Sequence, residues 1–180
     1  MKKIMIVDDN YLSAEGIEKN IDWETLNAEI IHVCYNGTSA IEAMKKEPAD
    51  LIISDIEMPD LDGISMSRQA LEINPMVKII LISAYDKFEY ARRALLLGAL
   101  DYIEKPLDYA YLIQKVKNAF ALMEKEQKNL QLLKQSRPLL TEKFFREITH
   151  LPSSEAAYRL KPYLKYLNLE LNYDFYTAVI

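Results

Sequence analysis

Three carboxylates, a hydroxyl and an ammonium group lie at the ends of short apolar runs of this sequence: Asp8, Asp9, Asp55, Ser83 and Lys105. Clustered carboxylate oxygens are hard ligands that suit Mg²⁺, which would neutralise their charge. A carboxylate can also act as a nucleophile and form an aspartyl phosphate. Because phosphoryl transfer depends on positioning and charge neutralisation, a metal ion and the ammonium would assist it, and the hydroxyl could hydrogen-bond a phosphoryl oxygen. If the fold brings these groups together, they predict phosphoryl chemistry around Asp55.

The apolar runs themselves are predicted strands of one parallel sheet. Each run is short and rich in branched residues, and each is followed by apolar residues at helical spacing. The strands show no clean alternation, which indicates an α/β fold whose sheet is covered on both faces. In such a sheet all carboxyl ends lie at one edge, where ligands bind, so the polar groups should converge there. The pattern occurs five times, with strands near 3–7, 28–34, 51–53, 77–82 and 100–103.

Each of these polar residues also has a plainer structural interpretation. Asp9 or Asn10 can cap the helix that follows, although one cap suffices and adjacent acids repel each other. Lys105 could be a surface lysine before a turn proline, and Ser83 could be a bystander at a strand end. Tyr102 could be core filling, because aromatic residues are common in strands. Acids gathered at one sheet edge need a compensating cation, which favours a binding site.

The composition is that of a globular protein with one domain and a remainder, or with two small domains. The chain has 180 residues, of which 50% are hydrophobic and 27% are charged, and its net charge is -5. The absence of a basic excess argues against nucleic-acid binding by these residues alone. The single cysteine, Cys34, cannot form an internal disulfide and is expected in the core of a protein from a reducing compartment. No apolar stretch is long enough for a signal peptide or a membrane span, so we predict a cytoplasmic protein without membrane contact.

The motifs, taken in order, resemble the receiver domain of two-component response regulators. Each motif alone is weak, whereas the ordered set is specific. The resemblance covers about residues 1–122 and implies a flavodoxin-like (βα)5 fold with parallel sheet order 2-1-3-4-5. It rests on Asp8-Asp9, Asp55, Met58-Pro59, Gly63, Ser83-Ala84 and Lys105-Pro106.

The resemblance also implies a role for each site residue. Asp55 would accept a phosphoryl group from a histidine kinase, Lys105 would pair with the phosphate, and the bond from Lys105 to Pro106 would be cis. Ser83 and Tyr102 would move toward the phosphate and bias the helix expected over 86–97. The protein would then be a switch, not an enzyme beyond its own phosphorylation and dephosphorylation. Mg²⁺ would be bound by Asp9, Asp55 and the backbone carbonyl of Glu57, and partly through water by Asp8.

The last helix of the predicted receiver continues as a heptad seam. Its first half can pack on its own domain, but beyond about residue 122 no sheet is left to cover. We therefore predict a helical coiled-coil linker over 123–136, a parallel homodimer through 112–133, and a helix break at Ser136-Arg137-Pro138. A dimer could also form through the receiver face that carries Arg92, Arg93 and Asp101, either in place of the coiled coil or together with it. The seam consists of Leu112, Val116, Ala119, Met123, Glu126, Leu130 and Leu133.

Residues 137–180 are expected to begin a smaller α/β middle region, with a helix over 155–167 and a strand over 173–180. We expect the chain to be part of a longer protein, because that strand lacks partners. Three features resemble the YesN-type branch of response regulators, which carry an AraC-type DNA-binding output domain: the long insertion around Ile21-Asp22-Trp23, the extended last helix, and the segment from Leu139 to Ile180. That domain is absent here, so DNA binding is implied only for a parent transcription regulator.

Two other functions stay open from the residues alone. One is a binding module with the receiver fold that is not controlled by phosphorylation. The other is a small Mg²⁺-dependent phosphohydrolase with an aspartyl nucleophile, which would need a substrate pocket and a general acid. Glu57 stands two residues past Asp55, the offset at which such an acid would be expected, but no cap domain to enclose it is visible in the sequence.

Overall fold

The computed structural model describes residues 1–84 and 88–148. The described strands are β1 (Lys2–Val7), β2 (Ala28–Cys34), β3 (Leu51–Asp55), β4 (Lys78–Ser83) and β5 (Asp101–Glu104). The described helices are α1 (Tyr11–Asn20), α2 (Gly37–Lys46), α3 (Gly63–Ile73), α4 (Phe88–Leu97) and α5 (Tyr109–Ile148).

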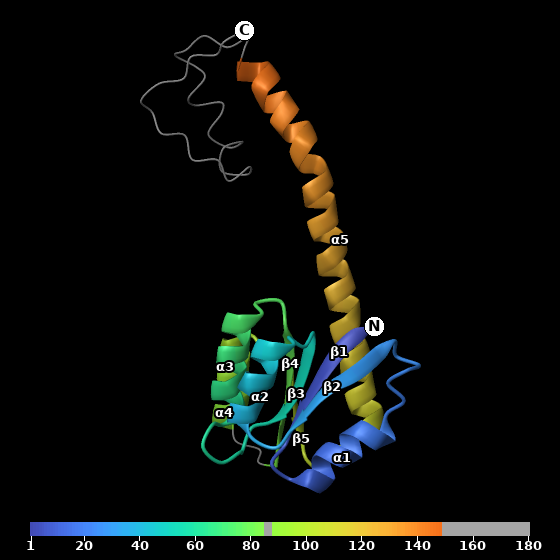
Figure 1. The fold of residues 1–180 in the computed structure, drawn as a ribbon, viewed down its shortest axis with the longest axis vertical. Helices are drawn as coiled ribbons and strands as arrows, with labels where there is room; N and C mark the ends of the chain where they lie inside the picture. The colour runs from blue at the N-terminus through green and yellow to red at the C-terminus, as the bar shows by residue number, and fades with distance from the viewer. Residues whose placement is uncertain (85–87, 149–180) are drawn as a thin grey trace. The chain divides into compact units, whose positions relative to one another are not determined.

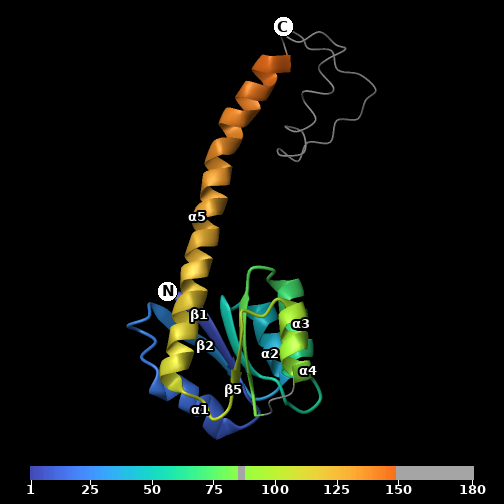
Figure 2. The ribbon, with the colours of Figure 1, turned by 180° about the vertical axis from the view of Figure 1, so that it is seen from behind.

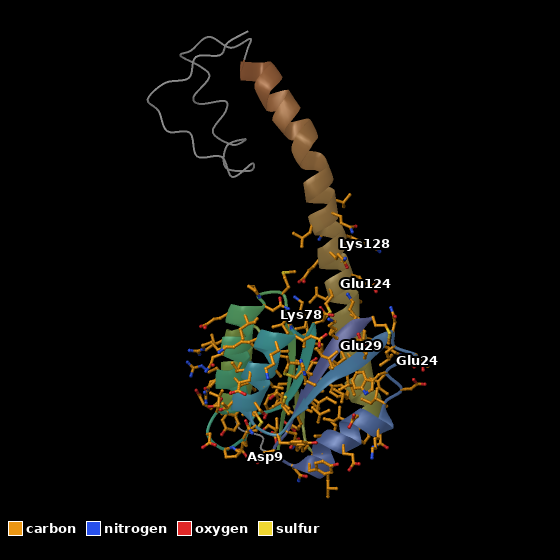
Figure 3. The ribbon with its side chains drawn as sticks, viewed as in Figure 1. Asp9, Glu24, Glu29, Lys78, Glu124 and Lys128 are labelled. Atoms are coloured by element: carbon orange, nitrogen blue, oxygen red, sulfur yellow. The ribbon has the colours of Figure 1, made fainter. Side chains whose placement is uncertain are left out.

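The strands form one parallel sheet in the order β2-β1-β3-β4-β5, which confirms the predicted topology (Figure 1). In the register of the sheet, Val7 of β1 lies beside Ser54 of β3, and Asp55 lies beside Ile82 of β4. Asp9 lies at one end of the sheet, and Lys78, the first residue of β4, lies at the other (Figure 3). The carboxyl ends of the strands therefore meet at the edge where Asp9 lies.

Helices cover both faces of the sheet. The first turns of α5 lie with α1 on one face, and α2, α3 and α4 lie on the other (Figures 1 and 2). Neighbouring residues of β1 serve different cores: Ile4 and Ile6 pack with α1 and α5, whereas Met5 and Val7 pack with α2, α3 and α4. This double burial explains why the strands read as continuous apolar runs.

Short polar side chains fix where the helices begin. Asn10 caps α1 by accepting hydrogen bonds from the backbone of Leu12 and Ser13, as predicted. The hydroxyls of Thr38 and Ser39 are also candidate caps for α2, but the side chain of Asn36 is the cap and accepts from the N–H of Ser39. Because α2 begins at Gly37, Asn36 stands at the position from which a side chain reaches the free N–H groups of the first turn, whereas Thr38 and Ser39 already lie inside that turn.

The first part of α5 belongs to the core beneath the sheet, as expected. Leu112, Val116 and Ala119 are buried, and the compact unit that contains the sheet ends at Met123. Glu124 and Lys128 are exposed on the second unit, Glu124–Ile180, and project from α5 (Figure 3). Leu130, a residue of the predicted heptad seam on this second unit, is 47% exposed.

The predicted helix break at residues 136–138 is wrong. The helix α5 continues through Pro138 to Ile148. A proline inside a helix lacks the N–H that would bond the carbonyl four residues earlier, and its ring crowds that carbonyl. Strong helix formers such as leucine and lysine stand close to Pro138 in the sequence and offset this local cost. The helix predicted over 155–167 and the strand predicted over 173–180 lie outside the described residues, as does the helix start at Asp86.

The charged residues on the α4 and β5 face have partners within the chain. Arg92 pairs with Glu89 at 3.4 Å, and Lys115 of α5 pairs with Asp101 of β5 at 2.6 Å. Arg93 approaches Asp62, the N-cap of α3, at 3.7 Å. The three residues named above as a second candidate dimer face are thus already engaged.

Candidate phosphorylation site

Asp55 is the last residue of β3, at the point where the chain leaves the sheet, and it is only 6% exposed. The loop after it folds back so that the N–H of Gly63 donates to the carbonyl of Ile56 at 2.9 Å. A Cβ atom at Gly63 would lie 2.0 Å from the backbone oxygen of Asp55. Only glycine therefore lets α3 begin this close to Asp55.

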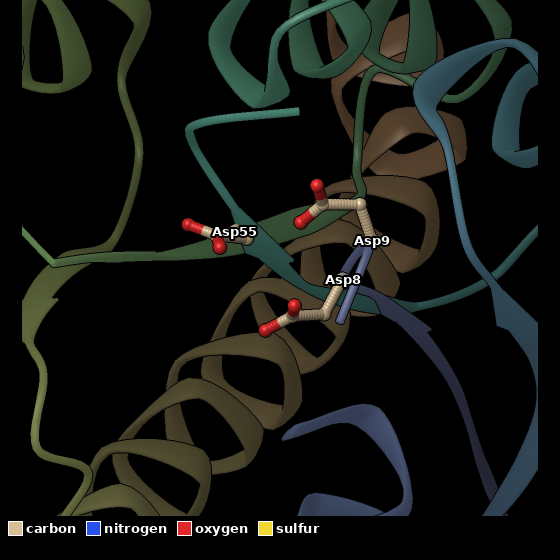
Figure 4. Close-up of side chains that lie close together, drawn as sticks. All are labelled: Asp8, Asp9 and Asp55. Carbon is tan, nitrogen blue, oxygen red and sulfur yellow. The ribbon is translucent and has the colours of Figure 1, made fainter. Parts of the chain in front are cut away.

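The carboxylates of Asp8, Asp9 and Asp55 form a cluster at the carboxyl edge of the sheet (Figure 4). One oxygen from each lies within 4.8 Å of the others. Asp8 is 1% exposed and accepts a hydrogen bond from the N–H of Asn10 at 2.9 Å, whereas Asp9 is exposed. The predicted convergence of the three acids is present in the structure.

Lys105 bridges the two buried acids of this cluster. Its Nζ donates to Asp55 Oδ2 at 2.7 Å and to Asp8 Oδ2 at 3.0 Å. The backbone N–H of Lys105 also donates to the carbonyl of Ser83 at 2.8 Å, which joins the ends of β4 and β5. The Lys105–Pro106 peptide bond is cis, the isomer that the resemblance implied.

Burial and charge act in opposite senses on the pKa values at this site. Burial raises the pKa of Asp8 above its ordinary value, against the hydrogen bonds from Asn10 and Lys105 that lower it. Burial alone would lower the pKa of Lys105, but the hydrogen bonds and charges of Asp55 and Asp8 outweigh it and raise that pKa. Lys105 therefore stays an ammonium ion among the acids.

One ammonium does not neutralise three carboxylates. With Lys105 paired to Asp55 and Asp8, the ionised cluster keeps a negative excess at the exposed side where Asp9 lies. The donors are all carboxylate oxygens, which are the ligands of a hard divalent cation such as Mg²⁺. The residues present therefore fit a magnesium site.

The remaining predicted residues lie on β4, on β5 and in the loop after β3. Ser83 is fully buried at the end of β4, and Tyr102 of β5 is half-buried against the core that α2, α3 and α4 cover. Glu57 lies in the loop after Asp55, and its N–H donates to Asp55 Oδ1 at 3.4 Å. The contact that the sequence did not predict is a hydrogen bond from the hydroxyl of Tyr90 on α4 to the carboxylate of Glu57, 3.2 Å long.

The site is open to solvent through a pocket beside α1. Asp8 and Lys105 line it together with Leu12, Ser13 and Pro106. Leu12 is an exposed apolar residue at the rim of this pocket. Asp8 and Lys105 are the residues of the site that line this pocket.

Comparison with known proteins identifies the family. Residues 4–117 match the sequence family described as "Response regulator receiver domain". The chain belongs to this receiver-domain family. Membership supports a phosphoacceptor function in two-component signalling, and it does not favour the unphosphorylated binding module or the phosphohydrolase.

The receiver domain has relatives among transcription regulators. It is 29% identical over 126 residues to the transcriptional regulatory protein YesN of Bacillus subtilis, covering 70% of this chain and 34% of YesN. It is 30% identical over 112 residues to the transcriptional regulatory protein HptR of Staphylococcus aureus, covering 62% of this chain and 44% of HptR. The chain thus spans less than half of the length of these relatives.

Solved structures of receiver domains share the fold. The receiver domain of AraT, a response regulator from Geobacillus stearothermophilus, is 34% identical, with a TM-score of 0.66 over 70% of this chain and 98% of that one. A two-component transcriptional regulator AraC from Clostridium phytofermentans is 31% identical, with a TM-score of 0.66 over 71% and 98% of the two chains. These likenesses confirm the predicted YesN-type and AraC-type branch.

No described helix is long and apolar enough to span a bilayer.

Proposed function

We propose that Asp55 accepts a phosphoryl group from the phosphohistidine of a histidine kinase in a Mg²⁺-dependent reaction. The observation that carries this proposal is the arrangement of Asp55, which is held by Lys105 at 2.7 Å and lies beside Asp8 and Asp9 in one carboxylate cluster. A carboxylate oxygen of Asp55 forms the new bond to phosphorus as the donor's P–N bond breaks, and the electron pair of that bond stays on the histidine nitrogen.

The chain's own residues orient the acceptor and balance charge. Lys105 holds one oxygen of Asp55 and would pair with the transferred phosphoryl group, while Ser83 would donate a hydrogen bond to it. Asp9, Asp55 and the backbone carbonyl of Glu57 would hold Mg²⁺, with Asp8 acting partly through water. When bound, the ion supplies positive charge for the phosphoryl oxygens. A chain from a solved complex of CheX and CheY with BeF3 and Mg²⁺ from Borrelia burgdorferi is 29% identical to this chain, which supports Mg²⁺ as the cation.

The domain acts as a switch whose only chemistry is its own phosphorylation and the later loss of that phosphoryl group. Ser83 and Tyr102 transmit the change to the α4 and β5 face. The receiver would comprise residues 1–122, the linker 123–136, and 137–180 the start of a middle region. The parent protein would be a cytoplasmic transcription regulator that dimerises through 112–133 and binds DNA through a separate output domain.

The test is the intact mass of the protein after incubation with Mg²⁺ and acetyl phosphate. One added phosphoryl group is expected for the wild-type chain, and none for Asp55→Asn or for wild type in EDTA. Addition that persists in Asp55→Asn would assign the chemistry to another residue. No addition with either acetyl phosphate or a phosphorylated histidine kinase would contradict the proposal.

A further inference from the structure

The helix α4 contacts the loop 56–62, which follows Asp55, at two points. Near its start, the hydroxyl of Tyr90 donates to Glu57 Oε1 at 3.2 Å. One turn later, Arg93 approaches Asp62 Oδ2 at 3.7 Å. Residues three apart lie on the same face of a helix, so one face of α4 meets both ends of the loop. These contacts join segments that are more than 30 residues apart in the chain.

Glu57 touches Asp55 on one side and α4 on the other. Its backbone N–H lies 3.4 Å from Asp55 Oδ1, while its side-chain carboxylate accepts the hydrogen bond from Tyr90. The other oxygen of Asp55 is held by Lys105. One residue therefore connects the carboxylate that is to be phosphorylated with the helix α4.

The two contacts differ in expected strength. The side chains of Arg93 and Asp62 are 40% and 39% exposed, and an ion pair of that kind contributes little because water screens it. Tyr90 and Glu57 are both half-buried, and a hydrogen bond to an ionised acceptor is stronger than one between neutral groups. The bond also holds the carboxylate of Glu57 on α4, next to the cluster of Asp8, Asp9 and Asp55 that already carries a negative excess. Tyr90 is therefore the stronger of the two connections.

We propose that Tyr90 is a positioning residue of the phosphorylation site, which latches the loop 56–62 to α4 through Glu57 and thereby couples cation binding at the acids to the order of α4. The coupling rests on the magnesium site of the proposed function, whereas the latch itself does not. Because linkage is reciprocal, a partner that orders α4 would also strengthen cation binding. This connection is separate from the one through Ser83 and Tyr102.

Amide hydrogen exchange, followed residue by residue by NMR, tests the latch in metal-free protein. Tyr90→Phe keeps the ring and removes only the hydroxyl. Loss of a hydrogen bond to a charged group is expected to raise the exchange rates of the amides in 56–62 by roughly tenfold. The matched control is Tyr111→Phe, which removes a hydroxyl from the exposed side of α5 and should leave those rates unchanged. Unchanged loop rates in Tyr90→Phe, or faster exchange confined to α4, would overturn the proposal.

Two substitutions of Glu57 sharpen this experiment. Glu57→Gln retains an oxygen that can accept from Tyr90, so it should keep most of the loop protection, whereas Glu57→Ala should lose it. In the Glu57→Ala background, Tyr90→Phe should then have no further effect, as expected for two groups that act through one contact. Additive effects of the two substitutions would contradict the latch.

Adding Mg²⁺ alone tests the coupling. In wild type and in Tyr111→Phe, saturating Mg²⁺ should slow exchange both at 55–58 and in α4. In Tyr90→Phe it should still slow exchange at 55–58 but no longer in α4. A full α4 response in Tyr90→Phe would refute the coupling. The absence of any Mg²⁺ response in wild type would contradict the magnesium site and the coupling together, while the metal-free comparison still decides the latch.

Discussion

Replacement of Lys105 by methionine removes the positive charge between two buried carboxylates while keeping a side chain of similar length. The Nζ atom lies 2.7 Å from Asp55 Oδ2 and 3.0 Å from Asp8 Oδ2. Removing one partner of a fully buried ion pair costs about 3–5 kcal/mol. The side chain of Lys105 is 24% exposed, so water screens part of the interaction. We therefore expect Lys105→Met to lower the free energy of unfolding of the metal-free protein by about 2–3 kcal/mol.

Urea unfolding in EDTA measures this loss, followed by the fluorescence of Trp23. Trp23 is the single tryptophan of the chain and is 7% exposed in the core beside α1, so its emission reports unfolding of the receiver. The loss corresponds to a urea midpoint lower by about 1–2 M. Lys117→Met, on the exposed side of α5, is the matched control and should leave the midpoint within about 0.5 kcal/mol of wild type.

Mg²⁺ should reduce the difference between Lys105→Met and wild type. The cation would bind the same carboxylates and supply the positive charge that the variant lacks, so the variant gains more stability from it. A metal-free Lys105→Met protein as stable as Lys117→Met would refute the view that the ammonium compensates the buried acids. If saturating Mg²⁺ leaves the difference in unfolding free energy between Lys105→Met and wild type unchanged, the view that Mg²⁺ and Lys105 share the same carboxylates would be refuted.

Four further outcomes are expected. Gly63→Ala should destabilise the protein by about 1–3 kcal/mol in urea unfolding and abolish phosphorylation, because its Cβ would meet the backbone oxygen of Asp55 at 2.0 Å. Burial raises the pKa of Asp8 in the folded protein above its value in the unfolded chain. The folded state therefore holds this proton more tightly, and the stability that it gains is fully present at a pH below the unfolded-state pKa and is lost as pH rises through the folded-state pKa. Mg²⁺ must displace that proton. As pH is lowered, the affinity for Mg²⁺ measured by calorimetry should therefore begin to fall at a higher pH than for a site of ordinary aspartates, and Asp8→Asn should lose this pH dependence. Burial also raises the pKa of the Cys34 thiol, so a thiol reagent should react slowly with the native protein and rapidly in urea. Leu130→Glu should leave receiver stability unchanged but shift sedimentation toward the monomer, and a wild-type chain that is monomeric at all concentrations would contradict the coiled coil.

The sheet and the acid cluster could be predicted because both follow from strong, local signals. A short apolar run flanked by turn residues and helical spacing defines a buried strand, as for 51–53 before Asp55. Parallel strands then bring their carboxyl ends to one edge without any knowledge of packing. The cluster of Asp8, Asp9 and Asp55 needs only this topology.

Features that depend on packing or on small energy differences could not be predicted in this way. The contact between Tyr90 and Glu57 depends on how α4 is rotated against the loop, which helical spacing alone does not determine. The cap of α2, Asn36, was hard to predict because several neighbouring residues could cap the helix and differ little in capping free energy. The helix α5 passes Pro138 because the neighbouring helical residues outweigh the lost hydrogen bond and the crowding that a proline ring causes in the preceding turn.

The salt bridge between Asp101 and Lys115, 2.6 Å long, limits how the face of β5 could join a second copy of the chain. An interface that recruited Asp101 would first break this bond and would then form an equivalent one across the interface. The number of ion pairs would be conserved, so this exchange would add specificity of orientation but almost no net affinity. Added salt would weaken the bond in the monomer and its replacement in the dimer alike, so an association of this kind would be nearly independent of ionic strength.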